Sequence, residues 1–420
     1  MVKNLGNEIA FFKSHSKPMR TLLITNLIYA LVLPIIEVFI GAYIMRNSSD
    51  LSLVVIFQLA VYLGIPTTFA INGWLLNHIR IPRLYALGML LSGISMTALM
   101  ALSTLTTFGI FITGLIMGLS YGFFWANRDF LALNTTNNSN RNYYYGIETF
   151  FYTMAGIVMP AMIGAFLSST EKFHWFNNNL NFAYYCLSGL VIILTIIASF
   201  IVHTGGFQNP KKAAFIYFKF DPLWGKMLRL AVLKGVGQGY IVTAPTMLIM
   251  TLVGKEGALG SIQSIAAFIS AILMYLIGRI SKPQHRLQIF GLGLAVFVIG
   301  AMFNAILYSA IGVILFVLFL IFARPLLDIA YFPIQLQVID SLAKKESRNE
   351  FAYIFNHEIG LLVGRLFGCG TFILLAWYVS DYIALRYALL FIALVQFLSY
   401  FVAKNILKDP SLTEHAENND

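Results

Sequence analysis

The sequence predicts an all-α integral membrane protein whose twelve transmembrane helices form two pseudo-symmetric six-helix bundles. Hydrophobic residues make up 59% of the 420 residues and charged residues only 11%, and the mean hydropathy of +0.77 is far above that of soluble domains. Apolar runs of about 20 residues, enough to cross a hydrocarbon core of about 30 Å, recur between short polar breaks. Because a backbone exposed to lipid must satisfy its own hydrogen bonds, these runs are expected to be helices.

The predicted spans fall into two sets of six. The first set lies at about 21–45, 51–78, 84–103, 107–133, 146–168 and 180–203, and the second at about 225–252, 259–279, 287–308, 311–338, 351–377 and 382–403. A lysine-rich segment with Gly-Gly and a proline, 204–224, separates them and is expected to be a cytoplasmic linker. The predicted domains are an N-terminal lead (1–20), the bundles 21–203 and 225–403, that linker and a tail (404–420).

Lysine and arginine are distributed unequally between alternate loops. If the N-terminus is cytoplasmic, the inner segments hold 19 of these residues and the outer loops only three, Arg46, Lys172 and Lys255. The positive-inside rule then predicts a multi-pass protein of the cytoplasmic (inner) membrane with both termini in the cytoplasm. This asymmetry also accounts for most of the net charge of +10, so the basic composition does not indicate nucleic-acid binding.

The two sets of helices show weak internal similarity. Arg83-Leu84, which opens the third predicted helix, recurs as Arg286-Leu287 at the start of the ninth, with an offset of 203 residues. An arginine in an inner loop is common by itself. Its recurrence at the equivalent place in a six-plus-six pattern favours a duplicated architecture.

The loop between the second and third predicted helices carries a degenerate form of a known signature. The stretch GWLLNHIRIPR, 73–83, resembles the motif G-x-L-x-D-R-x-G-R-K of the major facilitator superfamily. Gly73 and Leu75 match, whereas Asn77 replaces Asp, His78 replaces Arg and Arg80 replaces Gly. Twelve helices in two halves, a basic central loop and inner termini also resemble this family of transporters, over nearly the whole chain.

The resemblance implies which helices tolerate charge. In this family helices one, four, seven and ten line a central cavity, whereas three, six, nine and twelve face lipid, where a charged side chain is costly. In the four helices expected to face lipid, the only charged residue is Arg386, near the outer end of the twelfth. The other helices carry charges well inside their spans, among them Glu37, Arg128, Asp129, Glu148, Arg229, Lys234, Arg324, Asp328, Glu358 and Arg365.

The fourth helix ends in WANRDFLAL, which carries Asn127, Arg128 and Asp129 side by side. Arg128 lies about 30 Å along this helix, near its cytoplasmic end, at a depth similar to that of Glu148 in the fifth helix. Two interpretations are open, a structural ion pair and a cytoplasmic gate that breaks and re-forms. The predicted gating residues are Arg128, Asp129, Glu148 and Glu358.

Glu37 and Asp328 are the predicted proton-coupling residues. Glu37 follows Pro34 and lies about 24 Å into the first helix. Carboxyl groups at such depths are the usual proton carriers of transporters. A hydrogen-bonded substrate contact and a structural partner for a nearby base are the alternatives for Glu37. Asp328 stands four residues after Arg324 in the tenth helix, so an internal ion pair between these two residues is also possible.

Five residues are predicted to bind the substrate: Trp125, Lys234, Gln238, Arg324 and Arg365. The seventh helix reads RLAVLKGVGQGYIVTAP, and its glycines, each weakening a helix by about 1 kcal/mol, favour local bending near Lys234 and Gln238. Arg324 and Arg365 lie near mid-membrane, where a guanidinium group pairs with a carboxylate or holds an anionic group of the substrate. Trp125 offers a ring for stacking, although most aromatic residues of such a chain face lipid.

These patterns predict a secondary active transporter that moves a small organic solute by alternating access, with proton coupling as symporter or antiporter. A non-transporting membrane receptor and a flippase for lipids or amphiphiles on the same fold are the alternatives. The two cysteines and seven histidines form no metal-ligand spacing, and no nucleophile motif is present, so neither an enzyme nor a cofactor or metal is expected. The expected partners are a small-molecule substrate, protons and membrane lipid, with a monomeric protein.

Overall fold

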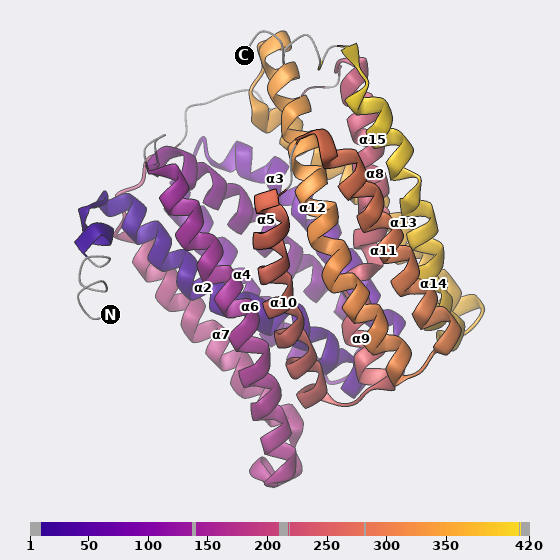
Figure 1. Cartoon of the computed structure of the whole chain (residues 1–420). Coiled ribbons are helices and arrows are strands. Elements are labelled where there is room, and N and C mark those ends of the chain that lie inside the picture. The colour runs from indigo at the N-terminus through magenta and orange to yellow at the C-terminus, as the bar shows by residue number, and fades with distance from the viewer. Residues whose placement is uncertain are drawn as a thin grey trace. The chain divides into compact units, whose positions relative to one another are not determined.

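The computed structural model describes residues 10–136, 140–209, 217, 219–280, 283–410 and 412. Parts of the predicted lead (1–9), linker (210–216 and 218) and tail (411 and 413–420) lie outside the described residues. All the regular secondary structure of the described residues is helical, and no strand occurs among them (Figure 1). The predicted all-α class is therefore confirmed.

The long helices follow the predicted spans closely. In chain order they are α2 (Lys17–Asn47), α3 (Ser52–Leu75), α4 (Ile81–Met100), α5 (Thr107–Thr135), α6 (Arg141–Lys172), α7 (Leu180–His203), α8 (Pro222–Ile241), α9 (Ala244–Leu252), α10 (Glu256–Ile280), α11 (Arg286–Leu307), α12 (Ala310–Glu346), α13 (Glu350–Tyr378), α14 (Asp381–Phe397) and α15 (Ser399–Leu407), with short 3-10 turns at Trp175–Asn178 and Pro283–His285. Within the described residues, 11 helices are long and apolar enough to cross a membrane.

The seventh predicted span, 225–252, differs from the prediction because it is broken into α8 and α9. Val242 and Thr243 separate the two pieces, and Pro245 stands in the first turn of α9. Proline has no N–H and cannot continue the hydrogen-bond ladder of the preceding turn, so the helix ends before it. The glycine-rich stretch indicated bending, but the proline determines where the break occurs.

The described residues form two compact units. The first unit comprises Met1–Tyr43 with Leu63–Lys212, and the second comprises Ile44–Tyr62 with Ala213–Asp420. In the second unit, Arg46 Nε donates to Glu256 Oε1 at 2.7 Å and Trp377 Nε1 donates to Ser52 Oγ at 2.9 Å, which ties the segment 44–62 to the rest of it. The predicted domain boundaries stay predictions.

Small residues allow close helix packing in the first unit. α4 packs against α5 and α7. Ser120 Oγ of α5 donates to Gly88 O of α4 at 2.6 Å, and a Cβ at Gly88 would lie 2.7 Å from Phe124 N. The Phe124 ring lies between Tyr29 and Tyr85, with centroids 4.1 and 5.2 Å away. This packing fixes the inner faces of α2, α4 and α5 against one another.

The second unit is built on a close contact between α8 and α13. A Cβ at Gly235 would lie 3.0 Å from Gly364 Cα, and a Cβ at Gly239 would lie 3.0 Å from Gly368 Cα. Small residues at four-residue spacing let two membrane helices approach along their backbones. The close approach brings Lys234 and Gln238 of α8 beside the charged residues of α13.

Candidate functional site

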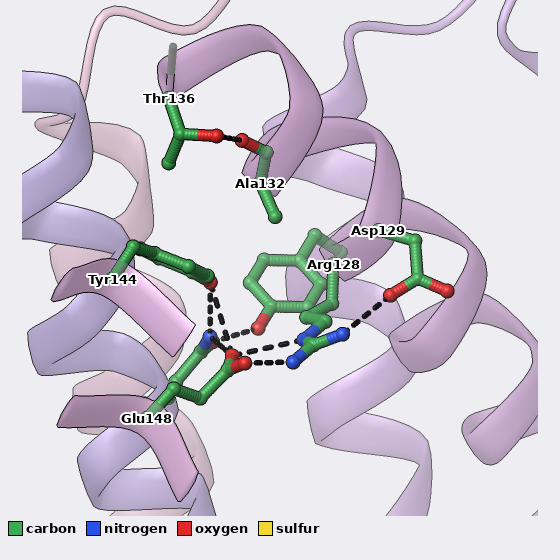
Figure 2. A network of polar contacts seen from close by, with 8 residues as sticks. Arg128, Asp129, Ala132, Thr136, Tyr144 and Glu148 are labelled. Carbon is green, nitrogen blue, oxygen red and sulfur yellow. Dashed lines mark hydrogen bonds and ion pairs between the residues drawn. The ribbon is translucent and has the colours of Figure 1, made fainter. Parts of the chain in front are cut away.

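The first unit contains a buried polar network centred on Glu148, which is only 1% exposed. Its carboxylate pairs with the Arg128 guanidinium, whose Nε donates to Oε1 at 2.8 Å. Asn26 Nδ2 and Tyr144 OH donate to the same oxygen, at 2.5 and 3.0 Å (Figure 2). The predicted pairing of Arg128 with Glu148 is therefore confirmed, while the role of this pair as a gate stays a prediction.

Helix geometry explains why these groups meet. Tyr144 and Glu148 stand four residues apart near the start of α6, so both side chains lie on one face. Asn26 is supplied by α2, and its Oδ1 in turn accepts a hydrogen bond from Tyr85 OH of α4. With four helices contributing, every oxygen and nitrogen named here has a partner, which a buried charge requires.

The three adjacent polar residues of WANRDFLAL contact different partners. Asn127 is fully buried and exchanges amide hydrogen bonds with Asn72 of α3, at 2.8 and 3.2 Å. Arg128 also donates through Nη1 to Asp129 Oδ1 at 2.6 Å, while the Asp129 side chain stays 50% exposed. One guanidinium thus serves two carboxylates, one buried and one open.

Trp125 and Glu37, two of the predicted site residues, also belong to the first unit. The Arg128 guanidinium lies 5.8 Å from the Trp125 ring centroid, and Tyr152 lies 5.9 Å from that ring. Trp125 therefore borders the polar network. Glu37 is exposed in α2, one turn beyond Pro34. Its predicted role in proton coupling stays a prediction.

A cavity of about 330 Å³ lies within the second unit. Five predicted site residues meet there: Lys234 and Gln238 from α8, Arg324 and Asp328 from α12, and Arg365 from α13. The remaining lining is aromatic, apolar or neutral polar: Tyr62, Gly237, Ile241, Val242, Phe290, Leu327, Tyr331, Gln396 and Ser399. An apolar hollow with a few convergent polar groups is the usual form of a small-molecule site.

Lys234 and Asp328, which both line the cavity, form an ion pair in which the lysine is more buried than the aspartate. Lys234 Nζ lies 3.2 Å from Asp328 Oδ1, a longer distance than the 2.7–2.9 Å typical of such bonds. The lysine side chain is 11% exposed and the aspartate side chain is 40% exposed. The ammonium group also lies 3.9 Å from the Tyr331 ring centroid and 4.0 Å from that of Phe332. The aromatic rings therefore hold the cation, and the carboxylate faces open space.

Arg365 is oriented by several partners at once. Its Nε and Nη2 both donate to Gln238 Oε1, at 3.1 and 2.9 Å, and Nη1 donates to Glu358 Oε2 at 3.2 Å. Its guanidinium also stacks over Tyr62, with Cζ 4.8 Å from the ring centroid. The structure pairs Arg365 with Glu358 and Asp328 with Lys234.

Arg324 forms a hydrogen bond at the break between α8 and α9. Its Nη2 donates to Ile241 O at 3.0 Å, a carbonyl at the last residue of α8. The last carbonyls of a helix have no partner within it, so side chains commonly bind them. The break in the seventh span therefore helps to position a cation at the cavity.

Sequence reasoning missed several residues of both regions. Asn26 and Tyr85 stand as single polar residues within apolar runs, which is a weak signal in a sequence. Their contacts in the Glu148 network depend on how the helices pack. Gln396 and Ser399 line the cavity from α14 and α15, in a helix expected to face lipid. Among the described residues, no cluster of three or more His, Cys, Asp or Glu could hold a metal ion.

Comparisons with known proteins agree with this architecture. The model of the Major Facilitator Superfamily matches residues 21–364. The uncharacterized protein YqgE of Bacillus subtilis (strain 168) is 22% identical over 399 residues, which cover 93% of this chain and 90% of that protein. Its name gives no activity.

Two solved transporters share the fold at low identity. A bacterial homologue of the human drug peptide transporters PepT1 and PepT2 has a TM-score of 0.64 and 11% identity, covering 93% of this chain and 98% of that one. The nucleoside transporter NupG has a TM-score of 0.66 and 13% identity, covering 93% and 99%. The family match over most of the chain, on an all-helical fold shared with these transporters, shows that this protein belongs to the Major Facilitator Superfamily.

Proposed function

We propose that the protein is a secondary active transporter that moves a small organic solute by alternating access and couples this movement to protons. The cavity of the second unit supports the proposal most directly. Its charged and polar residues lie inside a membrane helix bundle, where such groups are costly and usually mark a substrate or ion pathway. Family membership and the similarity to peptide and nucleoside transporters agree with transport, while the solute and the coupling ion are our proposals.

We assign proton coupling to Asp328 and Glu37. Asp328 lines the cavity. Among the ion pairs of the described residues, its one partner is Lys234, at 3.2 Å. Protonation of Asp328 would release Lys234, so a proton and a solute at this place influence each other. Glu37 is exposed in a proline-containing helix of the first unit, which makes it accessible to protons.

We assign gating to Arg128, Asp129, Glu148 and Glu358. The first three form one network near the predicted cytoplasmic end of α5, and Glu358 pairs with Arg365 in the second unit. An ion pair that breaks during transport influences the rate of exchange between states more than the affinity for solute. We further propose that the protein is a monomer of the cytoplasmic membrane. We also propose that both termini lie inside the cell, because the distribution of lysine and arginine favours that orientation.

Transport into proteoliposomes tests the proposal. The purified protein is reconstituted with a pH-sensitive dye inside, a pH gradient is imposed, and solutes of a chemically broad panel are added singly. A transported solute is expected to change the internal pH only when the protein is present. Asp328→Asn and Glu37→Gln should each abolish accumulation against a gradient while exchange of labelled for unlabelled solute survives.

Two exposed carboxylates provide matched controls. Asp340→Asn lies in the same helix as Asp328, and Glu350→Gln lies at the start of α13. Both variants should transport as the unaltered protein does. If no solute of the panel crosses the membrane, the transporter proposal fails. If accumulation in the Asp328 and Glu37 variants equals that of the controls, transport stands but proton coupling through these residues does not.

A further inference from the structure

We propose that the solute is a zwitterionic α-amino acid with an apolar side chain. It binds in the second unit's cavity with its ammonium group on Asp328 and its carboxylate on Arg365. The inference rests on the proposed function and names the substrate class that it leaves open.

Asp328 offers a carboxylate to a cationic group of the solute. It lines the cavity, its side chain is 40% exposed, and Lys234 is its one ion-pair partner among the described residues. Lys234 is also held by a second contact, because the ring centroids of Tyr331 and Phe332 lie 3.9 and 4.0 Å from its ammonium nitrogen. The Asp328 carboxylate therefore keeps acceptor sites toward the cavity, where an ammonium group of the solute can bind.

Arg365 offers a pair of donors to a carboxylate. A guanidinium has five N–H donors, and three of them are used by Gln238 and Glu358. One N–H therefore remains on each terminal nitrogen, Nη1 and Nη2, and this pair can bond to the two oxygens of a carboxylate. The Tyr62 ring beneath the guanidinium and its 9% exposure restrict its movement. Little conformational entropy remains to be lost when the solute binds.

Asp328 and Arg365 are held one helical turn apart along α8. Asp328 pairs with Lys234, and Arg365 bonds to Gln238, which stands four residues further along the same helix. Four residues correspond to about 6 Å of helix rise. A solute that bonds to both groups at about 2.8 Å must therefore carry its ammonium and its carboxylate close together, as on a single carbon atom.

A solute with only one charge would meet a like charge in this cavity. A simple acid on Arg365 would lie beside the carboxylate of Asp328, and a simple amine on Asp328 would lie beside the ammonium of Lys234. Like charges repel strongly in a membrane helix bundle, where the dielectric constant is low. A zwitterion meets each group with the opposite charge. Because it adds no net charge, its binding does not require an unbalanced charge on any lining residue.

The rest of the lining favours an apolar side chain on the solute. Phe290, Leu327, Ile241 and Val242 offer apolar surface. A volume of about 330 Å³ lies at the lower end of small-molecule sites, which run from about 300 to 1,000 Å³. A single amino acid with an aliphatic or aromatic side chain fits these limits, whereas a solute rich in hydroxyl groups would place them against apolar walls.

The solute and a proton are expected to compete for Asp328. A protonated carboxyl group has no charge to offer the ammonium, so the affinity should fall as the pH falls, and by linkage solute binding should favour proton release. The titratable and charged groups around Asp328 are Arg324 and Tyr331 on the same helix and, on other helices, Lys234, Tyr62, His357, Glu358 and Arg365. Of the two carboxylates, Asp328 and Glu358, only Asp328 lines the cavity.

The test is ligand binding to the full-length protein in detergent, measured by thermal unfolding. The probes are leucine and phenylalanine, each with the two compounds that lack one of its charges. These are 4-methylpentanoate and 3-methylbutylamine for leucine, and 3-phenylpropanoate and 2-phenylethylamine for phenylalanine. A bound amino acid at 100 times its dissociation constant should raise the midpoint by about 3 °C or more at pH 7.5. The singly charged compounds at the same concentration should not, and the shift should be smaller at pH 5.5.

An isomer of leucine tests the separation of the two binding groups. In 6-aminohexanoate the same atoms carry the ammonium and the carboxylate at opposite ends of the chain. It should therefore bind about tenfold or more weaker than leucine. Equal or tighter binding of 6-aminohexanoate would overturn the assignment to an α-amino acid.

Variants connect the shift to the cavity. Arg365→Lys keeps the charge but loses the planar pair of donors, so the affinity should fall about tenfold or more. Asp328→Asn should weaken binding to a similar extent, and the binding that remains should not vary with pH, so exchange in this variant is measured at saturating solute. The matched controls are Arg279→Lys, at an exposed arginine of α10, and Asp340→Asn, at an exposed carboxylate of α12. Both controls should bind as the unaltered protein does.

Three further results would overturn the proposal: stabilisation by the simple acids or amines equal to that by the parent amino acids; no shift with either amino acid; or the same affinity in Asp328→Asn and Arg365→Lys as in their controls. The transport assay separates this inference from the proposed function. Amino-acid binding without movement into proteoliposomes would overturn transport and leave the binding site standing. Transport of other solutes, without amino-acid binding, would do the reverse.

Discussion

The Glu148 network of the first unit and the cavity of the second unit use equivalent helices of the six-plus-six pattern for different ends. Each draws on the first, fourth and fifth helix of its half: α2, α5 and α6 in one, and α8, α12 and α13 in the other. In the network one arginine serves two carboxylates, and Glu148 is enclosed by hydrogen bonds. In the cavity Lys234, Arg324, Asp328 and Arg365 border open volume, and Glu358 pairs with Arg365.

The difference teaches how buried charges divide their roles. Where every polar atom is enclosed by protein partners, removing one of them leaves a charge with neither water nor partner, so the loss is one of stability. Where charged side chains border a hollow and keep unused donors, removing one chiefly affects what the hollow binds. The following predictions test this division, from the largest expected effect to the smallest.

Arg128→Met should destabilise the protein by about 3–5 kcal/mol, because it leaves Glu148 buried without its cation. Thermal unfolding in detergent measures the effect. The double variant Arg128→Met/Glu148→Leu should recover part of the loss, since it also removes the carboxylate. A midpoint in Arg128→Met within about 1 °C of the unaltered protein would mean that the network contributes little to stability.

Gly364→Ala should destabilise the second unit by about 1–3 kcal/mol through overpacking between α8 and α13. The added Cβ would lie 2.7 Å from Val236 N and 2.8 Å from Gly235 Cα, both backbone atoms. Gly370→Ala on the same helix is the matched control, because nothing lies within 4 Å of its added Cβ. Equal unfolding midpoints for the two variants would contradict the close packing that shapes the cavity.

Gln238→Leu should weaken ligand binding about tenfold with a far smaller loss of stability than Arg128→Met. The substitution removes the acceptor of two Arg365 hydrogen bonds, so the guanidinium loses its orientation. Isothermal titration with a solute that the transport assay identifies gives the affinity. A large fall in the unfolding midpoint with unaltered affinity would place Gln238 among the structural residues instead.

Asp221→Asn should have the smallest effect and a defined pH dependence. Asp221 accepts a hydrogen bond from Lys345 Nζ at 2.7 Å, and this contact holds the pKa of its carboxyl below the ordinary value of 3.8. A pKa lowered by folding adds stability above about pH 4, and this stability is lost as the pH falls through the folded-state pKa. The gap between the unfolding midpoints of the two proteins should therefore narrow from pH 6 towards pH 3. A gap that widens over this range would contradict the assigned contact.

The sequence was sufficient to predict the helices, and partly sufficient to predict which site residues meet. Length and hydropathy determine spans because each helix must cross the same thickness of hydrocarbon, and depth along a helix was enough to pair Arg128 with Glu148. Depth along a helix was not enough to predict the ion pairs of the second unit. Whether Asp328 pairs with Lys234 or Arg365 depends on the rotation of α8 and α13 about their axes, which the contacts among Gly235, Gly239, Gly364 and Gly368 determine.

Two further features escaped prediction for physical reasons. The contribution of Gln396 and Ser399 to the cavity depends on which face of α14 and α15 meets α8, and a short polar residue in an apolar run gives no direction. Asn26 similarly bonds to Glu148 within a set of contacts that also includes Tyr85 and Tyr144, from three different helices. Long-range partners of this kind depend on packing between helices far apart in the sequence.

Equilibrium binding of one transported solute to three proteins tests the division of roles most directly: the unaltered chain, Arg365→Lys and Arg128→Lys. Each substitution keeps the charge and removes the planar guanidinium, so only the position differs. We predict that Arg365→Lys weakens binding about tenfold or more at a nearly constant unfolding midpoint, and that Arg128→Lys lowers the midpoint with affinity within about twofold of the unaltered protein. Loss of the ligand in Arg128→Lys, with full affinity retained in Arg365→Lys, would contradict the assignment of the binding site to the second unit.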